Sequence, residues 1–212
     1  MPNLKSNNIL FLFKILSILL PIVLLTNCMS KSFDEEESLL VYLNDESNGY
    51  SYSKNINSYR YILLYRPTDL MTKIELNKTV KEKKSVDSLR KKYNQYIYLS
   101  LSMSKNNKEL LSVVPKNRQD FGVMSKQLTF DMRDKVHLFT QNKDTIDLVD
   151  FVYPKMYGMS NSTDILFVYP RNSKYLKGEY LNFSIEDLGF YTGEVKFKIS
   201  LKHINNEPKL KL

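Results

Sequence analysis

The residue types that most often carry catalysis or bind metal ions are scarce in this chain, whose 212 residues include one cysteine and two histidines. A single thiol cannot form a disulfide within the chain, and one cysteine with two histidines falls short of the four ligands of a typical structural zinc site. The sequence also lacks the short motifs of serine hydrolases, P-loop proteins, zinc proteases and dinucleotide-binding domains. We therefore expect no metal site and no cofactor.

The two histidines both fall on predicted strands. His203 continues the inward face of a strand expected at 194–203, so we expect it to be packed or at the rim of the core. His137 follows Val136 in a strand expected at 135–141, at an exposed position. Neighbours in space are invisible in one sequence, so an envelope hydrolase with an unrecognised active site stays open as the alternative to a non-catalytic protein.

The single cysteine, Cys28, comes directly after an N-terminal apolar segment. Lys5 and Lys14 precede an apolar run from Ile15 to Leu25 that one serine and one proline interrupt. A secretory signal has an apolar region of about 7–15 residues, whereas a membrane-spanning helix needs about 20. A longer span would place Lys14 within the membrane, at a cost of about 2.5–3.5 kcal/mol on insertion scales. We therefore expect residues 1–27 to be a signal peptide.

The sequence Leu25-Thr26-Asn27-Cys28 resembles the lipobox of bacterial lipoproteins, in which cysteine becomes the lipidated first residue of the mature chain. Leu25 and Thr26 match the aliphatic and small residues of that pattern, whereas Asn27 stands where Gly, Ala or Ser is usual. The resemblance implies lipidation at Cys28 with three acyl chains. Each buried CH₂ contributes about 0.8 kcal/mol, so such an anchor holds a protein stably at a membrane. The alternative is an unmodified thiol.

An acidic run, Asp34-Glu35-Glu36-Glu37, follows the cysteine closely. It resembles the export signal of surface lipoproteins of the phylum Bacteroidota, and it also suits the first turn of a helix, where carboxylates interact favourably with the helix dipole. We expect residues 28–37 to be an acidic linker after the lipidated cysteine. The expected location is the outer membrane, with the protein displayed at the cell surface; attachment facing the periplasm is the alternative.

The remaining residues, 38–212, predict a single α+β domain that is mainly antiparallel β-sheet or a small sandwich with two or three short helices. The chain is 42% hydrophobic, which is enough for a core, and no linker or low-complexity stretch divides it. Alternation of apolar and polar residues is clearest at 96–104 and 194–203. Other strands are expected at 50–54, 58–66, 127–132, 135–141, 145–153, 164–169 and 180–185, and helices at 38–46, 68–76 and 79–94.

Two further stretches, Tyr61 to Asp69 and Phe183 to Phe197, together with the lipobox resemble a family of uncharacterised Bacteroidota lipoproteins. The first ends a strand with a Pro-Thr-Asp step into a helix, and the second joins two strands through a turn bounded by Gly189 and Gly193. The family has no assigned activity, so the resemblance implies no catalytic residue. We expect both glycines to serve the turn, since glycine permits positive φ, and Glu186-Asp187 to cap it.

Two surfaces are candidates for binding. Residues 73–92 carry eight basic and three acidic residues, and a cationic helix face attracts anionic partners such as lipid headgroups or glycans. The candidate contacts are Lys83, Lys84, Lys91 and Lys92; a plain solvated face is the alternative. Nine of the 15 tyrosines fall between Tyr42 and Tyr98, either as an aromatic platform or as half-buried sheet residues.

Taken together, these patterns predict a membrane-anchored envelope lipoprotein with a non-catalytic binding or assembly role. Its expected partners are the membrane itself and an envelope protein or glycan. The secretory signal argues against nucleic acid as a partner.

Overall fold

Five strands form the first antiparallel sheet, in the order β2-β3-β4-β8-β7. Their bounds are β2 Ser51–Ile56, β3 Tyr59–Arg66, β4 Tyr96–Lys105, β7 Asp150–Val152 and β8 Thr163–Pro170. The structure, a computed structural model, describes residues 30–78 and 85–212. The strands expected at 50–54, 58–66, 96–104 and 164–169 are confirmed.

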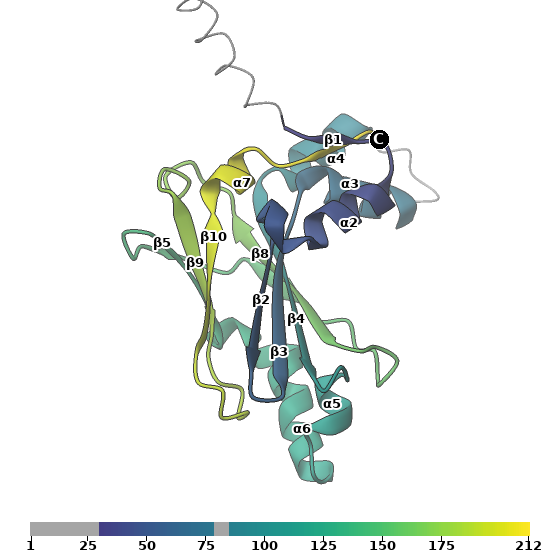
Figure 1. The fold of residues 1–212 in the computed structure, drawn as a ribbon, viewed down its shortest axis with the longest axis vertical. Coiled ribbons are helices and arrows are strands. Elements are labelled where there is room, and N and C mark those ends of the chain that lie inside the picture. Colours follow the sequence, from purple (N-terminus) through teal and green to yellow (C-terminus); the bar gives the residue numbers. More distant parts are fainter. Residues whose placement is uncertain (1–29, 79–84) are drawn as a thin grey trace, which may run out of the picture. The chain divides into compact units, whose positions relative to one another are not determined.

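The second antiparallel sheet has the order β10-β9-β5-β6 and faces the first (Figure 1). Its strands are β5 Val136–Thr140, β6 Thr145–Ile146, β9 Tyr180–Ile185 and β10 Val195–Ser200. A row of phenylalanine rings joins the sheets: the ring of Phe167 on β8 lies 5.7 Å from that of Phe183 on β9, which lies 6.4 Å from that of Phe197 on β10. The core therefore lies between two sheets, and the expected α+β class is confirmed.

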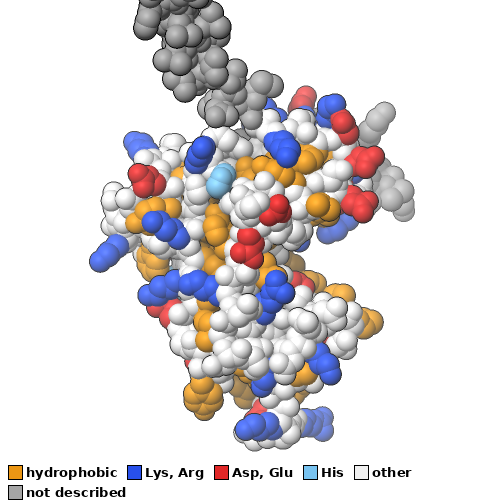
Figure 2. Space-filling model, in the orientation of Figure 1, with side chains coloured by type: hydrophobic (Ala, Val, Ile, Leu, Met, Phe, Trp, Pro, Cys, Tyr) orange, Lys and Arg blue, Asp and Glu red, His pale blue; other side chains and the backbone are white. Residues whose placement is uncertain are grey.

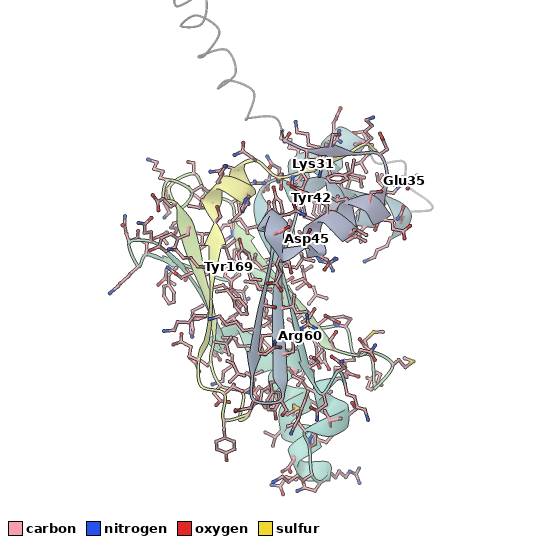
Figure 3. The ribbon with its side chains drawn as sticks, in the orientation of Figure 1. Lys31, Glu35, Tyr42, Asp45, Arg60 and Tyr169 are labelled. Atoms are coloured by element: carbon pink, nitrogen blue, oxygen red, sulfur yellow. The ribbon has the colours of Figure 1, made fainter. Side chains whose placement is uncertain are left out.

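Several tyrosines of the first sheet belong to this core. Tyr61 and Tyr65 are buried on the inner face of β3, and Tyr169 on β8 is fully buried between the sheets. Arg60 lies on the other face of β3 and is exposed (Tyr169 and Arg60 are labelled in Figure 3). The interpretation of the tyrosines as an exposed platform is therefore wrong: every tyrosine from Tyr42 to Tyr98 is buried or half-buried, and the alternation of β3 turns Tyr61 and Tyr65 inward.

Helices gather at both ends of the sandwich. Their bounds are α2 Glu36–Asn44, α3 Thr68–Lys78, α4 Val86–Tyr93, α5 Leu110–Val113, α6 Arg118–Lys126 and α7 Leu201–Asn205, with short helical turns at Glu46–Asn48, Gln127–Asp131 and Met132–Asp134. In Figure 1, α2, α3 and α4 lie at the upper end and α5 and α6 at the lower end. Within the described ranges, no helix is long and apolar enough to cross a membrane.

One segment expected as a strand, and the end of another, are helical. Leu128 and Met132 are fully buried while Phe130 between them is 70% exposed, so residues 127–132 follow a helical spacing of four rather than strand alternation. The last strand stops at Ser200, and Leu201 and Ile204, three residues apart, are the buried positions of α7. The segment expected as one strand at 145–153 is divided between β6 in one sheet and β7 in the other.

A short parallel pair, β1 Ser32–Phe33 with β11 Lys209–Leu210, brings the two ends of the folded unit together. The compact unit begins at Ser32 and α2 begins at Glu36. Part of the expected linker 28–37 is therefore folded, and the folded unit starts before residue 38. The first residues of the helix expected at 79–94 lie outside the described residues; its described part, α4, is capped by the Ser85 hydroxyl.

Candidate functional site

His137 lies on the outer face of the second sheet beside two partners that a hydrolase would need. Its Nε2 is 3.0 Å from Oε1 of Glu186, and Lys135 Nζ is 2.9 Å from the other oxygen of that carboxylate. Ser184 is the strand partner of His137 on β9, but the two side chains are not hydrogen-bonded and Ser184 is only 3% exposed. A substrate cannot reach this hydroxyl, so the geometry does not support a serine hydrolase here.

His203 lies on α7 and is half-buried, which confirms a packed histidine although on a helix rather than a strand. Its ring packs 5.1 Å from that of Tyr50 and against the backbone of Gly49. Burial and the neighbouring Lys202 ammonium lower the pKa of His203, while the backbone of Gly49 opposes them. The role of His203 is therefore in packing. Over residues 30–78 and 85–212, no group of three or more His, Cys, Asp or Glu side chains could hold a metal ion.

A largely buried charge cluster lies where the first sheet meets α3. The carboxylate of Glu207 accepts hydrogen bonds from the Tyr65 hydroxyl at 2.5 Å and the Thr68 amide at 3.1 Å, and it pairs with Arg171 at 3.2 Å. Burial and the adjacent Glu207 carboxylate raise the pKa of Tyr65 well above its usual value, so this tyrosine stays a protonated donor. The cluster ties the C-terminal segment to β3 and α3.

Next to this cluster is a cavity of about 560 Å³ between α3, α4 and the C-terminal segment, hereafter the anchor-end cavity. Its lining consists of Thr68, Asp69, Arg90, Lys91, Asn94, Glu207, Pro208 and Lys209. Asp69 pairs with Arg90 at 2.6 Å and accepts the Leu210 amide at 3.0 Å. The cavity therefore rests on two internal ion pairs and carries further lysines at its rim.

Of the four predicted contacts for an anionic partner, Lys91 lines this cavity. Lys92 instead lies 3.7 Å from Glu75 and over the Tyr93 ring at 4.9 Å, and Lys83 and Lys84 lie outside the described residues. Sequence reasoning missed Lys209. It joins the site because the backbone of the next residue, Leu210, is hydrogen-bonded to Asp69 and Arg90 of the cavity, and β11 has only two residues, too few to show a periodic signal.

Lysines also line the face where the edge strands β2 and β10 lie side by side (Figure 2). A hollow of about 450 Å³ there is lined by Lys54, Lys196 and Lys198, and the Tyr52 hydroxyl accepts the Ser200 amide across it at 3.2 Å. Lysines on edge strands prevent pairing with other chains. We assign these residues that protective role.

A groove of about 620 Å³ lies between α6, the β2–β3 hairpin and the β9–β10 loop, hereafter the loop groove. These elements lie at the end of the fold opposite to β1 (Figure 1). Tyr191 at the tip of the loop is 91% exposed, and Val123 on α6 is also exposed. The other apolar lining residues are Tyr59, Val114, Pro115, Met124, Leu188 and Phe190.

Hydrogen bonds and ring stacking hold the β9–β10 loop in place. The Asp187 carboxylate accepts the amides of Gly189, Phe190 and Gly193 at 2.9, 2.6 and 3.0 Å. This confirms Asp187 as a turn cap, whereas Glu186 pairs with Lys135 and His137. The Phe190 ring stacks on that of Tyr59, with centroids 4.7 Å apart.

Tyr191 has φ of 57°, a left-handed conformation that costs about 1–2 kcal/mol for a residue with a side chain. The loop therefore holds an exposed tyrosine in a strained backbone conformation. The glycine-bounded turn was visible in the sequence, but the exposure of Tyr191 was not.

The comparisons with known proteins identify no family for this chain. No family model and no curated protein matches the chain. Among solved structures, a protein of unknown function from Burkholderia pseudomallei matches with a TM-score of 0.39 and 8% identity, over 78% of this chain and 83% of that one. A DUF4426 family protein from Pseudomonas aeruginosa matches with a TM-score of 0.35 and 6% identity, over 71% of this chain and 94% of that one. Function must be argued from the residues of the chain itself.

Proposed function

We propose that this protein is a lipid-anchored lipoprotein of the bacterial cell envelope that binds an acidic, partly apolar segment of another envelope protein in its loop groove, without catalysis. The observation that carries the proposal is the position of Tyr191: an aromatic side chain that is 91% exposed, on a hydrogen-bonded loop at the end of the fold opposite to Ser32.

The short distance along the chain between Cys28 and β1 supports an orientation in which β1 lies near the membrane and the loop groove faces away from it. Ser32 is already paired in β1, and an extended chain covers at most about 3.3–3.6 Å per residue, so the four residue steps from Cys28 span roughly 14 Å. A lipid on Cys28 would hold β1 close to the membrane surface. The loop groove, at the other end, would then face away from that membrane toward a partner.

The exposure of Tyr191 contributes little to the stability of the fold, because a side chain in water buries almost no apolar area. Its left-handed backbone conformation costs free energy, and such strain persists only where the surroundings enforce it. Asp187 and the stacked pair of Phe190 and Tyr59 enforce it here. A tyrosine held rigidly in solvent loses little entropy on binding and provides a large contact area, which is the usual arrangement of binding hot spots.

The lining of the groove argues for the chemistry of the partner. Beside its apolar residues it carries the ammonium groups of Lys105 and Lys116, and its one carboxylate, Asp120, already accepts hydrogen bonds from the Lys116 amide and the Asn117 side chain. Carboxylates on a partner complement these lysines, and apolar side chains fit beside Tyr191 and Val123. The partner segment is therefore acidic and partly apolar.

Site-specific photo-crosslinking in cells of the source organism tests the proposal. A benzophenone amino acid at position 191 of the full chain is expected to crosslink to one envelope protein. The same probe at position 157, where Tyr157 is 71% exposed on the β7–β8 loop, is the matched control and should not capture it. The same crosslinks at both positions, or none at position 191, would overturn the binding role.

Charge substitutions separate the groove from a general basic surface. Lys116→Glu should lower the crosslinking yield at position 191, because it places a carboxylate against the acidic partner. Arg118→Glu changes the charge equally at an exposed neighbour that does not line the groove, and it should leave the yield unchanged. Equal losses in both variants would contradict recognition within the groove.

A further inference from the structure

We infer that the anchor-end cavity binds a phosphate group, and that a phospholipid headgroup of the membrane holding the protein supplies it. The phosphate chemistry follows from the cavity alone. The membrane as its source rests on the proposed function, since only a lipid anchor brings this end of the fold to headgroups.

Both acidic residues of the cavity are already satisfied within the protein. Asp69 binds Arg90 through both of its oxygens, at 2.6 and 3.3 Å, and also accepts the Leu210 amide. Glu207 accepts the Tyr65 hydroxyl and the Thr68 amide and pairs with Arg171. Each carboxylate is matched by one guanidinium, so the two pairs together add no net charge to the cavity.

Two lysines of the lining are not paired with a carboxylate of the described residues. Lys91 and Lys209 are both exposed, and neither pairs with an acidic side chain in the part of the chain that the structure describes. They leave about two positive charges at the rim of a hollow whose floor has no spare negative charge. That balance suits a phosphate group, which carries one to two negative charges and accepts several hydrogen bonds.

The position of Lys209 connects the cavity with the membrane. Lys209 is the strand partner of Ser32, which follows Cys28 by four residues, so this ammonium lies within reach of the anchor. Asp34, the acidic residue nearest β1, pairs with Lys211 at 2.5 Å. A lysine close to an anionic membrane surface contributes about 1 kcal/mol of attraction.

Hydrogen–deuterium exchange of the full lipidated chain tests the inference. The segments 86–94 and 207–211, which frame the cavity, are followed in three settings: maltoside detergent with and without inorganic phosphate, vesicles of phosphatidylglycerol, and vesicles of a phosphate-free galactolipid. At phosphate about ten times above its dissociation constant, bound segments should exchange about tenfold more slowly than without it. Phosphatidylglycerol should slow them likewise, and the galactolipid should not.

A double substitution, Lys91→Gln with Lys209→Gln, should abolish both effects. The matched control, Lys196→Gln with Lys198→Gln, removes two exposed lysines of β10 and should keep them. No slowing by phosphate or phosphatidylglycerol, or equal slowing in galactolipid, would overturn the phosphate site.

Slowing by free phosphate alone would support the cavity and overturn the membrane as its source. The detergent arm does not need an anchor, so a failure of lipidation, visible in the mass of the purified protein, would be distinguishable from a failure of the cavity.

Discussion

Ser32 is the direct strand partner of Lys209 in the parallel pair of β1 and β11. The Lys211 amide continues the pairing by donating to the Phe33 carbonyl at 2.9 Å, and Arg90 on α4 donates to the carbonyl of Leu210 at 3.2 Å. The first and last segments of the folded unit thus close one end of the sandwich, and Lys209 of β11 lies at the rim of the anchor-end cavity.

The Glu207 cluster should matter strongly for stability. Glu207→Gln removes the charge that balances the largely buried Arg171, and breaking such a buried pair costs about 3 kcal/mol. Urea denaturation monitored by circular dichroism measures the change. The control, Glu194→Gln, removes an ion pair to Lys196 that is mostly exposed and should cost at most about 1 kcal/mol. Equal losses in the two variants would show that the cluster does not hold the C-terminal segment.

Gly49→Ala should destabilise the protein more than Gly158→Ala. Both glycines have positive φ, 75° and 86°, so alanine is strained at either position. A Cβ at Gly49 would also overlap the His203 ring, with Nδ1 only 2.5 Å away, whereas nothing lies within 4 Å of a Cβ at Gly158. The overlap should add about 1–3 kcal/mol to the loss of unfolding free energy that urea denaturation measures.

A double variant, Gly49→Ala with His203→Ala, should recover part of that difference because it removes the ring. If Gly49→Ala and Gly158→Ala cost the same, the packing of His203 against Gly49 is not as described.

The β9–β10 loop should loosen in acid. Burial raises the pKa of Asp187, but the amides of Gly193, Phe190 and Gly189 lower it more, so the folded-state pKa lies below the usual 3.8. A group with a lowered folded-state pKa stabilises above its unfolded-state pKa of about 3.9, and this contribution is lost as the pH falls through the folded-state value. The protection factors of the three amides against hydrogen exchange report it.

At pH 7, Asp187→Asn should lower these protection factors by about fivefold, the equivalent of a lost cap of about 1 kcal/mol. The wild-type factors should fall toward those of the variant once the pH falls below the folded-state pKa of Asp187. Protection factors that Asp187→Asn leaves unchanged at pH 7 would contradict the role of Asp187 as the cap of the loop.

Local patterns predicted most of the sheet, because strand alternation follows from burial of one face. Strands β8 and β9 match their expected ranges closely, and on β8 the residues Ile165, Phe167 and Tyr169 are fully buried while those between them are more exposed. The same rule failed at 127–132, where Leu128, Phe130 and Met132 alternate with polar residues as in a strand. Packing instead buries the first and last of these three and leaves Phe130 in solvent. Only tertiary contacts decide between the strand period of two and the helical spacing of four.

The candidate sites were harder to predict than the fold. Lys91 could be selected by charge, but Lys209 lies far away in sequence and reaches the same cavity because the neighbouring Leu210 backbone is bonded to Asp69 and Arg90. Tyr191 was visible as part of a glycine-bounded turn, yet its exposure depends on Asp187 and on the stacking of Phe190 against Tyr59. Both sites depend on contacts between segments that no local pattern encodes.

Lipidation of Cys28 is best tested by intact-mass spectrometry of the protein extracted from membranes of its source organism. We predict a mature chain that begins at Cys28 and carries a diacylglycerol group on its sulfur and an acyl chain on its amino group. The Cys28→Ala variant should carry neither group and should be lost from the membrane fraction. An unmodified chain in the soluble fraction, or membrane retention that Cys28→Ala leaves unchanged, would contradict the anchor and the orientation proposed for the loop groove.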